Sequence, residues 1–187
     1  MEVVLSAEWR RRLSDALGEA QRIGMLGQES LDSVIDRSLG FVKSIPASTL
    51  DVIDVGSGGG DPGLVIAVCC PELSVTLVDR RAKRTDLLSR LVGRLGLADR
   101  VEVLEADVAL LPRRYPGRHW DVVTSRGFGS PAYTAAHTSV LLRNGGRMLV
   151  SEPPASNGDR WRTPEVESLG MFIEAVEYGV ARLVKKS

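Results

Sequence analysis

The sequence has few cysteines and no long apolar run, and each shortage excludes a class of protein. Only two of its 187 residues are cysteines. Cys69 and Cys70 are adjacent within an apolar stretch, where neither an ordinary disulfide nor a metal site is expected. No window reaches the run of about 18 apolar residues that a membrane span requires. The first residues, MEVVLSAEWRRRL, have too few apolar side chains for a signal peptide. We therefore expect a cytoplasmic protein without a membrane partner.

The chain also lacks an excess of charge of either sign. Twenty-four basic residues balance 24 acidic residues, so the formal net charge is zero. Bulk electrostatics therefore does not indicate a nucleic-acid-binding protein, and an RNA-binding surface would have to be a local patch. The basic residues are mostly arginines, which we attribute to genome composition. At this length, with 43% hydrophobic residues, the chain is expected to form one globular domain.

The first part of the chain has the periodicity of helices. Residues 6–44 predict two or three helices, with Gly24 and Gly27 as breaks between them. The apolar positions that recur at steps of three and four residues are Trp9, Leu13, Leu17 and Ala20, then Leu31, Val34, Ile35, Leu39 and Val42.

From residue 50 onward, apolar strands alternate with helical segments. The expected strands are 50–55, 74–79, 101–107, 120–125 and 145–151. This alternation predicts βαβ units and a parallel sheet that is covered on both faces. Residues 171–187 instead predict two strands joined around Tyr178 and Gly179, an antiparallel hairpin at the end of the sheet.

A cluster of glycines follows the first expected strand, in the stretch DVIDVGSGGGDPG of residues 51–63. Gly56, Gly58 and Gly60 would let the loop turn sharply and admit a ligand against bare backbone at the carboxyl end of the strand. A P-loop is excluded because no Lys-Ser or Lys-Thr follows the glycines. A dinucleotide site stays open, since Gly58, Gly60 and Gly63 satisfy G-x-G-x-x-G.

Acidic residues lie at the ends of successive expected strands. Asp79 ends the second strand, where a carboxylate can accept the hydroxyl protons of a ribose, or else cap the next helix. Asp107 follows the third strand and could accept from an adenine amino group, with the Val108 backbone against the ring. Asp54 precedes the glycines, at the edge of the cofactor site or as a brace for the loop's own N–H groups.

These strand-end features together resemble a class I S-adenosylmethionine-dependent methyltransferase. Four stretches over roughly residues 10–150 are similar to one family of that class, rRNA small-subunit methyltransferase G, also called glucose-inhibited division protein B. They are IGMLGQESLDSVIDRSLGFVKSI, DVIDVGSGGGDPGLVIAV, VTLVDRRAKRTDLLSRLVGRLGL and WDVVTSRGFGSPA.

The resemblance implies a fold and an activity. The fold would be α/β and Rossmann-like, with a seven-stranded, mostly parallel sheet, a C-terminal antiparallel hairpin and an N-terminal helical extension. The extension would be residues 1–46, and the S-adenosylmethionine-binding domain would be residues 47–187. The activity would be N7-methylation of a guanine in 16S ribosomal RNA, with the small ribosomal subunit as partner and S-adenosyl-L-methionine as cofactor.

The resemblance and the strand-end pattern also predict site residues. Arg126 is expected to be catalytic, because its guanidinium could engage a guanine edge or a phosphate, although a salt bridge to a neighbouring acid is equally compatible. The residues expected to bind the substrate are Lys83, Arg84, Phe128 and Glu152. Lys83 and Arg84 could instead be a solvated helix face, and Phe128 could be packing. The residues expected to bind the cofactor are Asp54, Gly56, Ser57, Gly58, Gly60, Asp79, Arg80, Asp107, Val108 and Arg126.

Two departures from the family pattern leave other functions open. Arg37 is followed by Ser38 rather than histidine, and Glu152 lies where a lysine is expected after the fifth strand. A small-molecule methyltransferase and a cofactor-binding protein without transferase activity are the alternatives. Guanine N7 carries no proton, so its methylation needs no catalytic base, whereas an oxygen acceptor would need one and Glu152 could serve.

Overall fold

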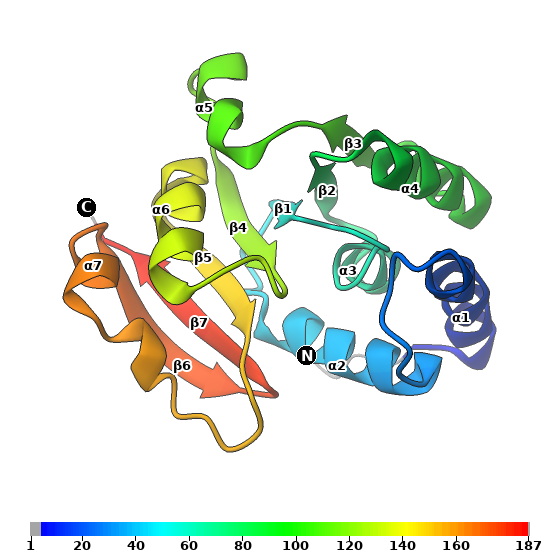
Figure 1. Cartoon of the computed structure of the whole chain (residues 1–187), viewed down its shortest axis with the longest axis horizontal. Helices are drawn as coiled ribbons and strands as arrows, with labels where there is room; N and C mark the ends of the chain where they lie inside the picture. The colour runs from blue at the N-terminus through cyan, green and yellow to red at the C-terminus, as the bar shows by residue number, and fades with distance from the viewer. Residues whose placement is uncertain (1–4, 187) are drawn as a thin grey trace.

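A seven-stranded sheet lies between two layers of helices in the computed structural model, which describes residues 5–186 (Figure 1). The predicted absence of a signal peptide rests partly on residues 1–4, which lie outside the described residues. The strands are β1 Asp51–Val55, β2 Ser74–Asp79, β3 Val101–Glu105, β4 Trp120–Ser125, β5 Leu142–Ser151, β6 Met171–Glu177 and β7 Val180–Lys185. The helices are α1 Ala7–Arg22, α2 Leu31–Ser44, α3 Gly63–Cys69, α4 Ala82–Leu95, α5 Leu111–Arg114, α6 Pro131–Thr138 and α7 Pro164–Glu167, with 3₁₀ turns η1 Val108–Leu110, η2 Ser139–Leu141 and η3 Asp159–Trp161.

The strand order is β3-β2-β1-β4-β5-β7-β6, and only β7 runs antiparallel to its neighbours. The predicted mostly parallel sheet with a final hairpin is therefore confirmed. From β1 the chain adds β2 and β3 on one side of that strand, and β4 then pairs with β1 on its other side. Ligands bind at such a switch point, outside the carboxyl ends of the strands.

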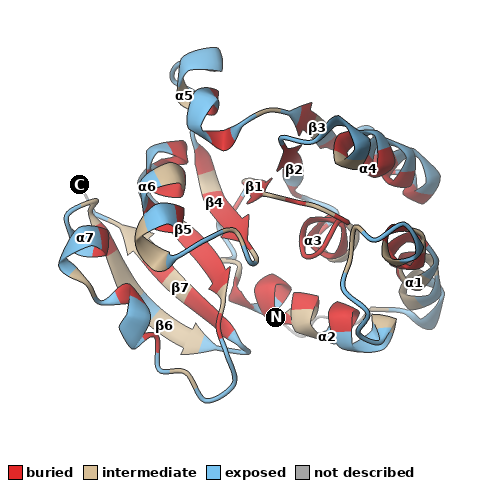
Figure 2. Cartoon of the chain, viewed as in Figure 1, coloured by how far each residue is buried: buried red, intermediate tan, exposed pale blue. Residues whose placement is uncertain are grey.

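Alternating side chains of each parallel strand enter two separate cores. In β1, Val52 packs with α1 to α4, whereas Ile53 and Val55 pack with α6 and α7 on the opposite face. Strands covered on both faces read as continuous apolar runs, which explains why the strand segments were recognisable in the sequence. Figure 2 shows the buried residues along the strands and on the sides of the helices that face them.

The N-terminal helices contribute to the first core. Residues 6–44 form two helices, and the side chains of Ser6 and Ser30 cap them by accepting the N–H groups of Trp9 and Ser33, each at 3.2 Å. Leu13 and Leu17 are fully buried in the core shared with α3 and α4. The division of the chain at residue 46 stays a prediction. Of the helices in residues 5–186, none is long and apolar enough to cross a membrane.

The packing of α2 on the β6–β7 turn depends on a glycine, which gives a stability prediction. A Cβ at Gly40 would overlap the backbone carbonyl of Tyr178, whereas one at Gly93, on the exposed side of α4, would meet nothing within 4 Å. We expect Gly40→Ala to lower the free energy of unfolding in urea by about 1–3 kcal/mol. Gly93→Ala, the matched control, should raise it by up to about 1 kcal/mol, because alanine favours the helix. Equal effects of both substitutions would contradict this packing.

Candidate functional site

One cavity of about 230 Å³ lies at the carboxyl ends of β1, β2, β3 and β4. We call it the main cavity. Six of the ten residues expected to bind the cofactor line it, together with Arg84 and Phe128 from the expected substrate residues. The residues that line it are Gly56, Val78, Asp79, Arg80, Arg81, Arg84, Ala106, Asp107, Val108, Arg126, Gly127, Phe128 and Tyr133.

The loop after β1 that contains the glycines, residues 56–63, packs closely against other parts of the protein. Gly56 has a φ of +74°, and a Cβ there would lie 3.0 Å from the Phe128 ring, so the missing side chain makes room for that aromatic. The N–H groups of Gly56 and Ser57 both donate to the Val78 carbonyl at 2.9 Å. Gly58, at φ +53°, is different, because a Cβ there would meet nothing closer than 3.7 Å. A Cβ at Gly58 would thus be in ordinary van der Waals contact with the protein, and the approach of a ligand to bare backbone in this loop stays a prediction.

Asp79 is the acid that organises this loop. Its Oδ2 accepts from the Gly58 N–H and from Arg84, both at 3.1 Å, and its Oδ1 accepts from the Arg81 N–H at 3.0 Å. The carboxylate is almost fully buried, yet the residue lines the main cavity. A ligand hydroxyl that reaches Oδ2 would replace Arg84, the most mobile of the three donors because it is a long side chain.

The wall formed after β3 combines a polar and an apolar residue. Asp107 is exposed and caps η1 by accepting the Ala109 N–H at 3.0 Å, while Val108 is buried beside it. An exposed carboxylate next to an apolar surface suits a flat heteroaromatic ring with an amino group at its edge.

Asp54 lies beneath the loop and does not line the main cavity. It is fully buried, and its Oδ1 accepts from the Thr124 hydroxyl at 2.7 Å. Burial raises its pKa from an ordinary value of 3.8 to about 6, against the opposing effect of the bonds from Thr124 and Ser57. Asp54 therefore joins β1 to β4 in this structure, and its expected contact with the cofactor stays a prediction. Ser57, Gly58 and Gly60 likewise lie outside the cavity lining.

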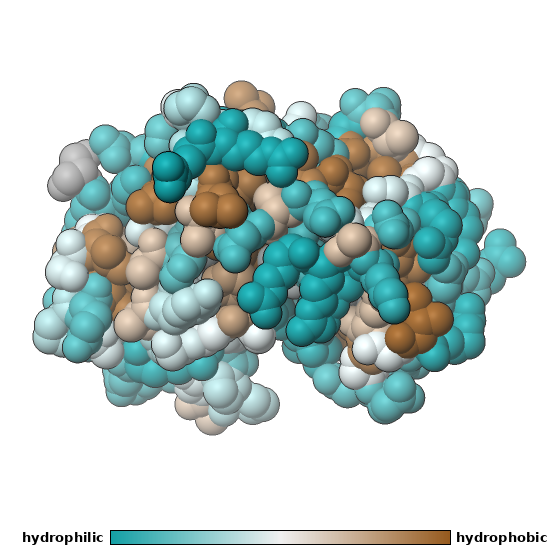
Figure 3. Space-filling view, turned by 45° about the horizontal axis from the view of Figure 1, so that its top comes forward, coloured by the Kyte–Doolittle hydropathy of each residue, from teal (hydrophilic) through white to brown (hydrophobic). Residues whose placement is uncertain are grey.

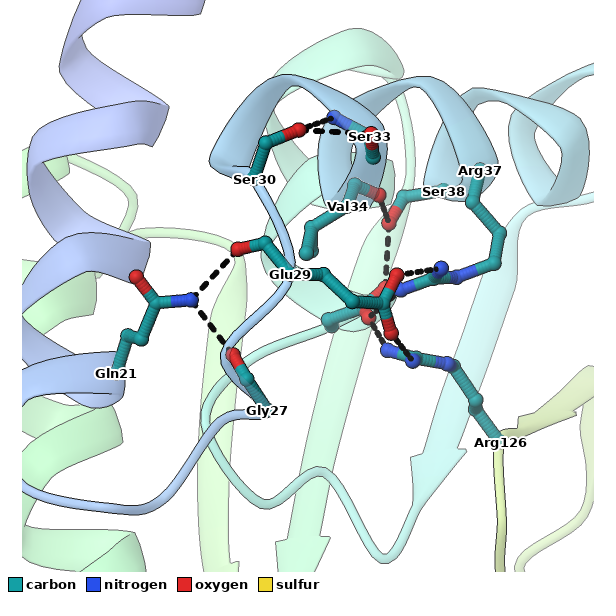
Figure 4. Close-up of polar contacts among 10 residues, drawn as sticks. Gln21, Gly27, Glu29, Ser30, Ser33, Val34, Arg37, Ser38 and Arg126 are labelled. Atoms are coloured by element: carbon teal, nitrogen blue, oxygen red, sulfur yellow. Dashed lines mark hydrogen bonds and ion pairs between the residues drawn. The ribbon is translucent and has the colours of Figure 1, made fainter.

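Arg126 enters the main cavity from the loop after β4, and an acid from the glycine loop fixes it there. Its Nη1 pairs with the buried carboxylate of Asp61, and its Nη2 lies 3.5 Å from Glu29 in the α1–α2 loop. Arg37 of α2 pairs with Glu29 and lies 3.7 Å from Asp61 (Figure 4). The salt-bridge alternative for Arg126 is thus present in the structure, and it coexists with a place in the cavity wall.

Further contacts hold this ionic cluster in position. The Gln21 side chain donates to the carbonyls of Gly27 and Glu29 at 2.6 and 2.8 Å, which pins the α1–α2 loop (Figure 4). The Ser38 hydroxyl lies within hydrogen-bond distance of Asp61. Burial, with the nearby charge of Arg37, lowers the pKa of Arg126 below its ordinary value. The cluster therefore connects the N-terminal helices to the loop that carries Arg126.

The remaining expected substrate residues are dispersed. Arg84 contacts Asp79, and Lys83 is exposed on α4 outside the cavity lining. Phe128 lies between the glycine loop and Tyr133, with a ring-centroid distance of 5.6 Å to the latter. Figure 3 shows one face of the molecule as largely hydrophilic, with hydrophobic residues in separate patches.

The expectation for Glu152 needs correction. Its side chain is fully buried, and it accepts from Arg160 at 2.5 Å, from Trp161 at 2.6 Å and from Ser156. Burial alone would raise its pKa, but the bonds from Ser156, Trp161 and Arg160 outweigh it, so the pKa lies below the ordinary value. A buried carboxylate whose oxygens already accept several hydrogen bonds, and whose pKa is lowered, is neither an accessible substrate contact nor an effective general base.

Sequence reasoning missed Asp61 and Glu29, which hold Arg126. A signal for Asp61 was present in the sequence. It lies within the glycine stretch, directly before Pro62, and an acid at this position does not make the loop more flexible. Glu29 lies in a loop without periodicity, and no local pattern predicts its contact with a residue almost 100 positions later.

The strand order with its antiparallel final hairpin, and a glycine loop followed by an acid at the end of β2, define a class I methyltransferase fold. The solved structure of cofactor-bound Rv0187 from MTB supports this, with a TM-score of 0.67 at 17% identity over 95% of this chain and 90% of that one. The family described as rRNA small subunit methyltransferase G matches residues 19–157. The chain therefore belongs to the rRNA small subunit methyltransferase G family.

Individual relatives carry the same name. A ribosomal RNA small subunit methyltransferase G of Ralstonia nicotianae is 32% identical over 177 residues, which cover 93% of this chain and 75% of the relative. The protein of that name in Neisseria meningitidis is 38% identical over 114 residues, but the match covers only 61% of this chain and 53% of the relative. The chain thus spans between about half and three quarters of these relatives.

The raised pKa of Asp54 predicts a specific pH dependence. The folded chain holds this proton more tightly than the unfolded chain, so the contribution to stability is complete below pH 3.8 and is lost as the pH rises through about 6. Asp54→Asn keeps an acceptor for Thr124 but does not titrate. Between pH 4.5 and 7.5, we expect the stability of the variant to rise relative to wild type by about 2 kcal/mol in urea unfolding. Every other titrating group is common to the variant and wild type, so its effect drops out of the difference in unfolding free energy. A difference that stays constant across this pH range would contradict the raised pKa of Asp54.

Proposed function

We propose that this protein transfers a methyl group from S-adenosylmethionine to N7 of a guanine in 16S ribosomal RNA. Membership of the rRNA small subunit methyltransferase G family supports the reaction and the RNA substrate. The observation that carries the proposal is the main cavity, whose wall holds both the Asp79 carboxylate, bonded to the Gly58 N–H, and the guanidinium of Arg126. A ribosomal RNA substrate implies that the protein acts in the cytoplasm, on the small ribosomal subunit.

The residues of the main cavity fit an adenosyl cofactor. Asp79 offers a buried carboxylate for the ribose hydroxyls once Arg84 moves away. Asp107 and Val108 offer an acceptor and an apolar surface for the adenine. The same arrangement of glycine loop and strand-end acid serves nucleotide recognition in other open α/β sheets.

The chemistry asks the protein for orientation rather than for proton transfer. When bound, the sulfonium cofactor supplies an electrophilic methyl carbon, the guanine N7 lone pair forms the new bond, and the carbon–sulfur bond breaks with its electrons going to sulfur. In-line attack requires the acceptor to be held behind the methyl carbon and shielded from water. Arg126, fixed by Asp61 and Glu29, contributes a rigid donor for the acceptor nucleotide.

A methyl-transfer assay tests the proposal directly. Labelled S-adenosylmethionine is offered with small ribosomal subunits, naked 16S RNA and a metabolite extract. We expect label in RNA at a guanine, and we expect Arg126→Ala to reduce turnover by about tenfold or more while the affinity for S-adenosylhomocysteine is retained. Arg143→Ala is the matched control, because Arg143 pairs with Asp121 at the opposite end of β4.

Other outcomes of this assay identify the alternatives. Label in the extract alone would indicate a small-molecule methyltransferase, which the buried Glu152 after β5 leaves open. Cofactor binding without label in any acceptor would indicate a protein that only binds the cofactor. Parallel loss of binding and turnover in Arg126→Ala would show that Arg126 serves the cofactor instead of the acceptor.

The cofactor position has its own test. We expect Asp79→Ala to weaken S-adenosylhomocysteine binding at least tenfold in calorimetry, because hydrogen bonds to a charged group contribute about 1.5–3 kcal/mol each. Arg84→Ala is the control, since it keeps the carboxylate and removes its competing partner. Its affinity should equal or exceed that of wild type. Unchanged affinity in Asp79→Ala, with the fold intact by circular dichroism, would refute the placement.

A further inference from the structure

The turn between β6 and β7 presents a tyrosine in a backbone conformation that tyrosine rarely adopts. Tyr178 and Gly179 form this two-residue connection, with φ angles of +55° and +73°. A two-residue turn with positive φ at both positions favours asparagine or aspartate first, because most other side chains are strained there. Tyr178 is also 60% exposed, so burial does not explain the choice of an aromatic residue. Its ring is therefore available for a contact outside the folded chain.

The turn lies at the same edge of the sheet as the main cavity. Val180, the first residue of β7, pairs with Ser151 at the carboxyl end of β5, and the Glu152 N–H donates to the Gly179 carbonyl at 2.8 Å. In the strand order β4-β5-β7, the turn is two strands beyond β4, which is about 10 Å at the ordinary spacing of neighbouring strands. Figure 1 shows the turn at the tip of the hairpin, beside α2. A chain that enters the main cavity can therefore also reach Tyr178.

A lysine of α2 accompanies the tyrosine. The Nζ of Lys43 lies 5.3 Å from the centre of the Tyr178 ring. Lys43 is exposed and forms no ion pair with any residue between 5 and 186. The helix and the turn are in close contact, because a Cβ at Gly40 would overlap the Tyr178 carbonyl. Backbone packing thus holds an aromatic ring and an unneutralised cation side by side.

We propose that Tyr178 and Lys43 form a second RNA contact, in which an unpaired base of the ribosomal RNA stacks on the tyrosine ring and the adjoining phosphate binds the lysine. The inference rests on the proposed function and adds a site to it. Tyr178 lies beyond residues 19–157, the part of the chain that matches the family, and outside the lining of the main cavity.

The chemistry of this surface fits a nucleotide. A flat base linked to a phosphate matches an aromatic ring beside a cation, and stacking on aromatic side chains is a common mode of single-stranded RNA recognition. The exposed neighbours of the ring, Lys43, Glu177 and Gly179, do not form the apolar patch that a protein partner would cover. A chain of zero net charge also has to hold RNA by short-range contacts of this kind.

Tyr178→Asn separates a ligand contact from a structural role. Asparagine tolerates positive φ, so we expect the variant to unfold at the same or a higher urea concentration than wild type. Loss of the stacked base should nevertheless weaken the binding of small ribosomal subunits about fivefold or more in a filter-binding assay with S-adenosylhomocysteine present. Tyr178→Phe should bind within about twofold of wild type, because stacking needs the ring and not the hydroxyl. Wild-type affinity of Tyr178→Asn, whatever its stability, would overturn the proposal.

The salt dependence of binding tests the lysine. Loss of one phosphate contact in Lys43→Gln should reduce the slope of log affinity against log salt concentration by about 0.7–0.9. Lys186→Gln is the matched control, because Lys186 lies 4.7 Å from the centre of the Phe172 ring, at the opposite end of the same hairpin. It removes the same charge and should leave the slope unchanged. Equal changes in the two variants would contradict a contact at Lys43.

These binding measurements require no methyl transfer, so they can fail separately from the proposed function. If wild type methylates a guanine of the RNA but Tyr178→Asn and Lys43→Gln bind as wild type does, the second RNA contact is refuted and the function stands. If wild type transfers no methyl group to RNA, the proposed function fails. Subunit binding that both variants weaken would then still support the second RNA contact, and binding that neither weakens would refute it as well.

Discussion

The main cavity depends on the parallel pairing of β1 with β4. In this register Val55 lies opposite Ser125, so the two strands end side by side and their following loops start from the same point. One loop carries the glycines and Asp61, and the other carries Arg126 and Phe128. The buried bond from Thr124 to Asp54 crosses between the same two strands directly below the loops. The switch in strand order at this point separates the helices that follow each strand and leaves the space that the main cavity occupies.

A common device recurs around that space, in which a buried or nearly buried acid holds an arginine at a cavity wall. Asp79 holds Arg84, Asp61 holds Arg126, and Glu152 holds Arg160. This pairing explains how a chain of zero net charge can still present donors to an anionic substrate. Long-range attraction to RNA is weak for such a chain, so on the proposed function recognition depends on short-range contacts with fixed guanidinium groups.

The sequence predicted the parts of this structure that depend on local pattern. The strands were recognisable because both faces are buried. Asp79 was recognisable because it ends β2, and Asp107 because it follows β3 closely. The contacts of Glu152 were not predictable, since Arg160 returns to it through an irregular segment that has no periodicity. Asp54 was expected at the cofactor's edge, but strand alternation cannot tell whether a strand-end acid points into the cavity or across to the neighbouring strand. Gly56 shows the same limit, because the aromatic ring that requires a glycine there comes from Phe128, 72 positions later in the chain.

The departure from the family pattern after β5 acquires a physical meaning on this structure. The sequence replaces an expected lysine by Glu152, which alone would put a negative charge beside an RNA substrate. In the fold that charge is buried and paired with Arg160, which lines a small cavity at the carboxyl ends of β4 and β5. A lysine would place a flexible ammonium at this point, whereas an arginine bonded to Glu152 and to the Ser151 carbonyl has a fixed plane and fixed donor directions. The substitution therefore places the positive charge on another side chain and fixes its orientation.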